Sequence, residues 1–385
     1  MTKHSLPART EVFIVGAGPA GAVLARELAR SGVDVLLCDK AKFPRGKTCA
    51  GGLTLRALAL LPFDITPVVE SFITGVAFTM NLEDFSVRRY PQPIMATVRR
   101  EKFDHFLVQE AVKAGAKFFE ESQFVSLFPD EKNVRVETSA GPCTAKYVVG
   151  ADGAQGRVAR TMGLLKKPSH ILAVHSEAPT DLLPQWDPDL IHVDWGSLKR
   201  SYAYLFPKKN ILSMGAGGFG IPAAKMKNYQ RAFLATRFQK DGLLPFGAAG
   251  FMIPLRSKRC PIQQGRVLLA GDAAGLADPF TGEGIFSSVR SARIAASVLK
   301  EAVRAGWNSL QGYEDEINKQ LMPELESSRM FRELFNLCPS FFHGKVAGNE
   351  RWWNAMAKIL RGEKTFLDLK RKLGLLGSLL YRMAR

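Results

Sequence analysis

The order of apolar and polar residues predicts a strand, a helix and a second strand near the start of the chain. Glu11–Val15 is a short β-branched and aromatic run, which is typical of a buried parallel strand. Ala22–Ser31 consists of good helix formers, and Gly32 ends this stretch. Val33–Cys38 is a second apolar run. The pattern therefore predicts a βαβ unit over residues 11–40.

Later stretches predict a second sheet and a return to the first one. Residues Phe72–Arg89 alternate apolar and polar positions, and several further strands are expected between Ile171 and Ile253. A buried strand is then expected, with Asp272 at the carboxyl end of that strand, and a long helix is expected over Ile285–Val303. The remainder, Asn308–Arg385, is expected to be helical.

These elements predict an α/β fold: a discontinuous Rossmann-type domain, an inserted and mostly antiparallel β-sheet domain for the substrate, and a C-terminal helical region. The expected boundaries are 8–70, 96–168 and 256–306 for the first domain, 71–95 and 169–255 for the second, and 307–385 for the helical region.

A glycine motif lies where the first strand turns into the first helix. It comprises Gly16, Ala17, Gly18, Pro19, Ala20 and Gly21 and matches G-x-G-x-x-G. The first glycine permits a tight turn, the second lets the backbone approach a pyrophosphate, and the third lets the helix pack on the strand. The helix N-terminus offers free N–H groups to the phosphates. Asp39, about 20 residues on, is placed to bind a ribose hydroxyl. The motif in this context predicts a dinucleotide site.

The composition is strongly basic, because lysine and arginine outnumber aspartate and glutamate. The formal charge is +17 with a pI near 9.8, which favours an anionic membrane, a phosphorylated substrate or nucleic acid as a partner, or simply serves solubility. No nucleic-acid recognition motif occurs, so nucleic acid is not expected. Residues 351–385 mix clustered cations with Trp and Leu. That mixture suits an interfacial helix on an anionic bilayer, or a docked helix with a solvated basic face.

Targeting and metal signals are sparse. The first ten residues contain no apolar core of a signal peptide, and no run approaches the roughly 20 apolar residues of a membrane span. The five cysteines show no C-x-x-C spacing, which fits a reducing cytosol and argues against a zinc or iron–sulfur site. We therefore expect a cytoplasmic protein without a metal, peripheral on the membrane.

Three separated pieces of the sequence resemble one superfamily. They are GAGPAG followed by Asp39, VGADGA around Asp152, and LLAGDAAGLADP around Asp272. Together they resemble the FAD-dependent oxidoreductases of the p-hydroxybenzoate-hydroxylase fold. Within it, residues 43–53 (FPRGKTCAGGL), 202–208 (YAYLFPK) and 278–285 (DPFTGEGI) resemble stretches of the geranylgeranyl reductase family. Ala50 and Tyr204 depart from that family's usual glycine and tryptophan, which loosens the choice of substrate.

The resemblance implies FAD as the cofactor and saturation of isoprenoid double bonds. It assigns the glycine motif to the pyrophosphate, Asp39 and Lys40 to the adenosine ribose, and Gly284 with Ile285 to the flavin ring. The other residues expected at the FAD are Arg45, Cys49, Ala50, Gly52, Arg100, Val125, Asp152 and Asp272.

Saturating an isolated alkene requires a hydride on one carbon and a proton on the other, in a site that excludes water. Cys49 is the candidate catalytic residue, as a proton donor or gate; a role in the FAD loop alone is the alternative. Arg45 is expected at the FAD phosphates, although it could instead pair with a diphosphate or phospholipid head. Tyr202, Tyr204, Phe206 and Phe219 are candidates for the substrate wall, with a plain core role as the alternative.

The sequence thus favours an FAD-dependent reductase of geranylgeranyl or other polyprenyl chains on a lipid, quinone or chlorophyll-type molecule. NADPH or ferredoxin would supply the electrons. The alternatives are a flavin monooxygenase or halogenase acting on a hydrophobic substrate, and an electron carrier to membrane quinone.

Overall fold

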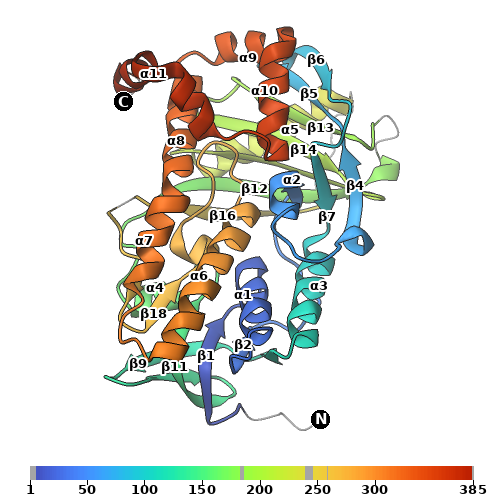
Figure 1. Ribbon diagram of the computed structural model, residues 1–385. Helices are drawn as coiled ribbons and strands as arrows, with labels where there is room; N and C mark the ends of the chain where they lie inside the picture. The colour runs from blue at the N-terminus through green and yellow to red at the C-terminus, as the bar shows by residue number, and fades with distance from the viewer. Residues whose placement is uncertain (1–5, 183–185, 239–245, 258, 384–385) are drawn as a thin grey trace.

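The computed structural model describes residues 6–182, 186–238, 246–257 and 259–383. Three sheets and a C-terminal group of helices make up this part of the chain (Figure 1). The parts of the sequence predictions that fall on residues 183–185, 239–245, 258 and 384–385 lie outside the described residues.

An eight-stranded sheet forms the lower half of the molecule in Figure 1. Its main path runs β17-β18-β11-β1-β2-β8, in which β1 pairs in parallel with both β2 and β11. The bounds are β1 Arg9–Val15, β2 Val35–Cys38, β8 Lys117–Phe119, β9 Phe124–Pro129, β10 Val134–Thr138, β11 Gly141–Gly150, β17 Gln263–Gln264 and β18 Val267–Leu269.

Helices cover this sheet through apolar faces. Helix α1 (Pro19–Ala29) packs between α3 (Arg100–Lys113) and α6 (Ile285–Ala305). The centre of β1 is fully buried, and its apolar side chains join those of α1 and α6 in one core. The shorter helices are α2 (Leu55–Leu58) and α4 (Arg157–Thr161), with single turns η1 (Thr66–Val68), η2 (Thr180–Leu182) and η3 (Gly271–Ala274). The predicted βαβ unit and Rossmann-type sheet are confirmed.

A seven-stranded sheet lies above the first one, in the order β16-β12-β15-β14-β13-β5-β6. All neighbours in it are antiparallel except β13 and β5. Helix α5 (Ala223–Phe238) covers one face with an apolar cluster. The bounds are β5 Gly75–Met80, β6 Glu83–Arg89, β12 Ser169–Pro179, β13 Leu190–Trp195, β14 Ser201–Pro207, β15 Ile211–Gly218 and β16 Phe246–Leu255. This is the inserted, mostly antiparallel sheet that the sequence predicts.

The third sheet is small and antiparallel, and its strands lie in the order β3-β7-β4. Its strands are β3 (Gly52–Thr54), β4 (Val69–Ile73) and β7 (Met95–Val98). The alternating stretch from Phe72 to Arg89 therefore serves two sheets, because its first residues belong to β4 and the rest to β5 and β6. The domain boundaries given above remain predictions.

The C-terminal region is helical, as expected. Its helices are α7 Gln311–Gln320, α8 Met322–Leu337, α9 Pro339–Gly348, α10 Glu350–Arg361 and α11 Phe366–Met383. Helices α9 and α10 lie against the seven-stranded sheet, α7 packs on α6, and α8 continues from α7 toward α9 and α11 (Figure 1). In the described part of the chain, no helix combines the length and apolar content needed to cross a bilayer.

Candidate active site

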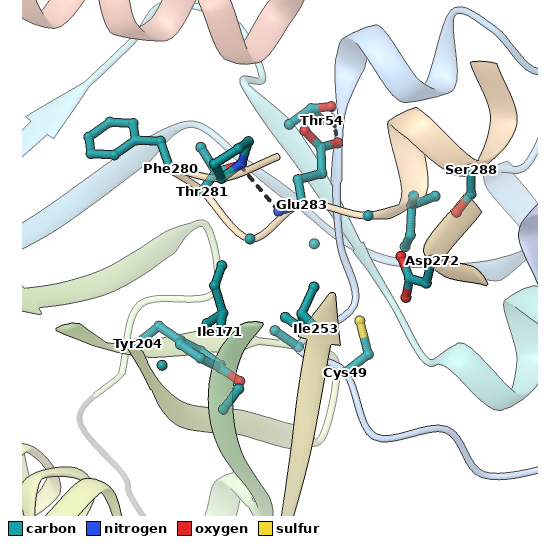
Figure 2. A pocket seen from close by; sticks show the side chains of 18 of the residues that line it. Cys49, Thr54, Ile171, Tyr204, Ile253, Asp272, Phe280, Thr281, Glu283 and Ser288 are labelled. Atoms are coloured by element: carbon teal, nitrogen blue, oxygen red, sulfur yellow. Dashed lines mark hydrogen bonds between the residues drawn. The ribbon is translucent and has the colours of Figure 1, made fainter. Parts of the chain in front are cut away.

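A cavity of about 1760 Å³ lies between the two large sheets and the C-terminal helices. Its walls include the carboxyl ends of β1 and β2, residues 45–52, the inner face of the seven-stranded sheet and the loop before α6. Figure 2 shows Cys49 and Asp272 on one side of this space, and Tyr204 with Ile171 on the other. A binding pocket for a single drug-sized ligand measures about 300–1,000 Å³. The cavity therefore has room for more than one such ligand.

The glycines of the motif have two different roles: Gly16 and Gly21 shape the turn, whereas Gly18 leaves its backbone open to the cavity. Gly16 has a φ of +100°, and a Cβ there would lie 2.4 Å from the Ala151 carbonyl oxygen. A Cβ on Gly21 would lie 1.9 Å from the Gly16 carbonyl oxygen, so α1 packs directly on the turn. A Cβ on Gly18 would have Arg45 Nη2, at 3.8 Å, as its nearest neighbour, and the Gly18 backbone faces the cavity. Gly16, Gly18, Pro19 and Ala20 line the cavity, whereas Ala17 and Gly21 lie behind it.

Asp39 lies at the end of β2 and fixes the glycine turn. Its Oδ2 accepts a hydrogen bond from the Ala17 N–H at 2.8 Å, and its Oδ1 accepts one from the Ala41 N–H at 2.9 Å. Asp39 and Lys40 both line the cavity. The carboxylate therefore shapes the same wall as the motif.

Cations gather where α3 and residues 45–47 meet. Arg100 donates two hydrogen bonds of 2.8 Å to Asp104, and Arg45 Nη1 lies 3.2 Å from the same carboxylate. Burial alone would lower the pKa of Arg100, but Asp104 and then Cys49 raise it well above its usual value. Burial lowers the pKa of the Lys47 ammonium, with Arg100 adding to the effect. This wall is therefore positive and partly desolvated.

Asp272 also lines the cavity, close enough to Lys47 and Arg100 for their charges to act on its carboxyl. Burial raises the pKa of its carboxyl, against the opposing influence of Lys47 and Arg100. Its Oδ1 is buried and has no hydrogen-bond partner among the described residues. A Cβ on Gly284 would lie 2.8 Å from that oxygen, so the glycine leaves room at the start of α6. Gly284 and Ile285 line the cavity beside Asp272.

The loop that carries Cys49 reaches the second sheet. The Gly51 N–H donates to Cys49 Sγ at 3.4 Å. Gly51 has a φ of +76°, and a Cβ on Gly52 would lie 2.7 Å from Phe206 Cε1. Cys49, Ala50 and Gly52 all line the cavity. The loop thus joins the polar wall to the aromatic one.

Two further predicted residues, Asp152 and Val125, differ in whether they line the cavity. Asp152 lines the cavity; its Oδ2 accepts hydrogen bonds from the N–H groups of Arg157 and Val158, and burial raises its pKa. The Val125 side chain is 53% exposed and lies outside the cavity, which the preceding Phe124 lines instead. Because β9 alternates its side chains, a shift of one residue moves Val125 to the outer face.

The apolar part of the cavity lies against the inner face of the seven-stranded sheet. Tyr202, Tyr204, Phe206 and Phe219 all line it. The rings of Tyr204 and Phe206 meet edge to face at 5.6 Å, and Tyr202 Oη donates to the Thr281 carbonyl oxygen at 3.0 Å. The first three side chains come from β14, and Phe219 directly follows β15.

The C-terminal helices supply a further wall of the cavity, which the sequence predictions did not include. Residues of α8 to α11 line the apolar part, including Phe335, Phe342, Trp353, Met356, Leu360 and Phe366. Trp353 is 2% exposed, and its Nε1 donates to the Arg89 carbonyl oxygen at 2.7 Å. The spacing of Trp353, Met356 and Leu360 is three and four residues, the signal of one helical face, and could have indicated this wall.

A buried ionic cluster holds the loop before α6 in place. Arg56 Nη2 lies 2.9 Å from Glu283 Oε2, and Arg56 also approaches Asp278 and Glu324. Thr54 donates to Glu283, and Glu324 accepts from the first N–H groups of α11 (Figure 2 shows Thr54 with Glu283). The cluster ties α2, this loop, α8 and α11 together. Elsewhere in the described residues, as here, no group of three or more His, Cys, Asp or Glu side chains is placed to bind a metal.

Comparison with known proteins gives matches over most of the chain. Residues 9–193 and 255–322 match the family described as FAD binding domain. Digeranylgeranylglycerophospholipid reductase 1 of Methanopyrus kandleri is 29% identical over 351 residues, 84% of this chain and 90% of the relative. Geranylgeranyl diphosphate reductase of Synechocystis sp. is 26% identical over 317 residues, 75% and 74% of the two chains.

A solved structure shares the fold. The geranylgeranyl bacteriochlorophyll reductase-like protein of Thermoplasma acidophilum aligns with a TM-score of 0.78 at 22% identity. The alignment covers 95% of this chain and 99% of that one. At this identity the likeness describes the fold.

Proposed function

Because the chain belongs to the FAD binding domain family, as an oxidoreductase with FAD as its cofactor, we propose that it reduces carbon–carbon double bonds of geranylgeranyl or similar polyprenyl chains. The chain would be carried by a lipid, quinone or chlorophyll-type molecule. The names of the relatives support a polyprenyl substrate. The observation that carries the proposal is the apolar extension of the cavity, which is continuous with the glycine turn.

The residues of the polar wall fit FAD. The backbone of Gly18 is open to the cavity at the N-terminus of α1, where a pyrophosphate is stabilised by free N–H groups. The unpartnered Oδ1 of Asp272 can accept a hydrogen bond from a cofactor hydroxyl. Arg45, Lys40 and Asp152 would complete this part of the site. FAD, when bound and reduced, supplies the hydride of the reaction.

The apolar wall fits an extended hydrocarbon chain. Aromatic side chains of β14 and of helices α8 to α10 face the cavity from opposite sides. Such a lining excludes water and offers a long, thin chain contact along its length. Cys49 lies where the polar and apolar walls meet, so we place it beside the reacting ring, as a proton donor or as part of the lining.

The cavity opens to the surface at the C-terminal helices. Leu337, Phe341, Trp352 and Leu373 line the cavity and are also 38–55% exposed. Lys345 lies 5.5 Å from the centre of the Phe341 ring, and Arg351 and Lys372 flank the same opening. Apolar side chains ringed by cations suit an anionic bilayer surface. We therefore propose that the protein binds the membrane at this opening and takes its substrate there, with NADPH or ferredoxin as the electron donor.

An anaerobic turnover experiment tests the function. Purified protein with FAD is reduced with NADPH or with dithionite and mixed with a geranylgeranyl lipid in detergent, and products are analysed by mass spectrometry. The proposal predicts a gain of two hydrogens for each double bond. A product that instead gains an oxygen or a halogen atom in air would favour a monooxygenase or halogenase. Unchanged lipid under all these conditions would refute the reductase.

A further inference from the structure

A line of polar side chains runs along the inner face of the seven-stranded sheet and reaches the cavity at Tyr204. In β12, Ile171 and Ala173 line the cavity, and strand alternation places His175 and Glu177 on the same face. In β14 that face carries Tyr204, which also lines the cavity (Figure 2). A phenol, an imidazole and a carboxylate therefore follow one another along the inner face of the sheet.

A glycine between the strands lets the phenol reach the imidazole. Gly215 of β15 is the register partner of both His175 and Tyr204. A Cβ on Gly215 would lie 2.3 Å from Tyr204 Oη, so no other residue leaves space for this hydroxyl. The Tyr204 side chain crosses β15 there, and its Oη lies 3.2 Å from His175 Nδ1.

Glu177 connects the imidazole to the surface. Its Oε1 lies 3.8 Å from His175 Nε2 and accepts hydrogen bonds from Lys208 Nζ at 2.8 Å and from Ser213 Oγ at 2.7 Å. The Glu177 side chain is 44% exposed, whereas Tyr204 and His175 are 6% and 5% exposed. The three groups thus lead from water to the cavity wall.

The two ends of the line differ in protonation: the Tyr204 phenol is protonated, whereas the Glu177 carboxylate is ionised. Burial raises the pKa of the Tyr204 phenol well above 10, so the phenol keeps its proton. The contact with His175, opposed by partial burial and aided by Lys208 and Ser213, holds the pKa of Glu177 well below its usual range. Glu177 is therefore an anion beside the imidazole. Burying the Tyr204 phenol and the His175 imidazole is costly, which favours a chemical role.

We propose that Tyr204 is the acid that protonates the alkene, and that His175, held by Glu177, returns the proton to it. This inference rests on the proposed reductase function. It assigns Cys49 to the lining of the cofactor rather than to proton donation.

The proton balance is simple. The Tyr204 O–H bond breaks as a C–H bond forms on one alkene carbon, while the other carbon receives the hydride of the reaction. The phenolate takes the proton from His175 Nδ1 while Nε2 takes a proton from solvent beside the Glu177 carboxylate, and the imidazole then returns to the tautomer with hydrogen on Nδ1 before the next turnover. Each reduced double bond thus consumes one hydride and one solvent proton. This direction requires the imidazole tautomer with hydrogen on Nδ1.

The main test compares matched tyrosine variants. Tyr204→Phe removes the acid, and Tyr229→Phe removes a hydroxyl that bonds to Asp194 on the opposite face of the same sheet. General acids contribute about 10²- to 10⁴-fold to a rate, so Tyr204→Phe is expected to slow alkene reduction by at least about 100-fold. FAD content, measured by absorbance, and the rate of flavin reduction by dithionite should stay at wild-type values in both variants, and Tyr229→Phe should reduce the alkene normally.

His175 acts through Tyr204, so its test needs a measurement that reports on the return of the proton to Tyr204. His175→Ala is expected to slow repeated turnover more than the first turnover, and added imidazole should restore part of the rate. In apoprotein labelled with ¹⁵N-histidine, the Nδ1 signal lost in His175→Ala should shift in Tyr204→Phe and stay in place in Tyr229→Phe. This last measurement needs neither FAD nor substrate.

The outcomes separate the two proposals. A wild-type enzyme that reduces the lipid, with Tyr204→Phe equally fast, overturns the relay and leaves the reductase intact. Equal losses in Tyr204→Phe and Tyr229→Phe would mean a structural effect and also overturn it, as would an unmoved Nδ1 signal. A wild-type protein that reduces no polyprenyl lipid overturns the proposed function and the relay with it.

Discussion

Replacing Gly18 by alanine tests the cofactor site without disturbing the fold. Gly18 has φ −75° and ψ −174°, an extended conformation that alanine adopts without strain. The added methyl group would meet only Arg45 Nη2, at 3.8 Å. It would project into the cavity at the first turn of α1. The apoprotein should therefore keep its stability, while a ligand that approaches the backbone there is pushed away.

The size of the effect follows from the interaction that is lost. A hydrogen bond to a charged group contributes about 1.5–3 kcal/mol, and each 1.4 kcal/mol corresponds to a tenfold change in affinity. Displacing the pyrophosphate from one N–H of α1 should therefore weaken FAD binding about 10- to 150-fold. In the apoprotein, a glycine-to-alanine change at a compatible position stabilises by about 0.4–1 kcal/mol, and the slight preference for glycine over alanine before a helix opposes this gain.

Gly21→Ala is the contrasting variant. Its methyl group would lie 1.9 Å from the Gly16 carbonyl oxygen and 3.3 Å from Ile14 Cγ2. Overpacking of this kind costs about 1–3 kcal/mol or more, so the apoprotein itself should lose stability. The two variants are compared by urea unfolding of the apoprotein and by fluorescence titration with FAD. Wild-type FAD affinity in Gly18→Ala, with unchanged unfolding, would refute the placement of the pyrophosphate at this turn.

Three further predictions concern buried charge and the cavity opening. Burial raises the pKa of Asp272. The folded apoprotein should therefore lose stability as pH rises from about 3.9, the pKa of an unfolded Asp, through the raised pKa of the folded state. In thermal unfolding, Asp272→Asn should be more stable than wild type at pH 7 and equal to it below pH 3. Arg56→Met leaves the carboxylate of Glu283 without its buried partner, and we expect a loss of about 3–5 kcal/mol in urea unfolding; a loss under 1 kcal/mol would contradict a tight cluster. Trp352→Ser should weaken cosedimentation with anionic vesicles about tenfold, whereas Trp307→Ser, a similarly exposed tryptophan at the end of α6, should bind like wild type.

The residues of the polar wall could be predicted because their signals are local. A strand, a glycine turn and a helix follow one another within 20 residues, so the turn that holds the motif needs no information from the rest of the chain. Asp272 could also be placed, since a buried strand of the same parallel sheet ends beside it. Gly21 shows the limit of the motif, because it shapes the turn from behind and does not line the cavity.

The orientation of side chains across elements could not be predicted in the same way. Which of Phe124 and Val125 faces inward depends on the pairing of β9 with β10, where the register shifts near Thr138. His175 could be assigned to a strand, yet its contact with Tyr204 passes over Gly215 of a third strand. Nothing in the spacing of these residues along the chain indicates that contact.

The position of the C-terminal helices follows from what the seven-stranded sheet would otherwise expose. Helix α5 covers one face of this sheet, and the other face carries Phe78, Trp195 and Phe206. A bare apolar face of that kind is unfavourable in water. Trp353 and other residues of α9 and α10 cover it, and the same side chains bound the cavity. The C-terminal segment is therefore part of the fold, and its helices form one wall of the apolar cavity.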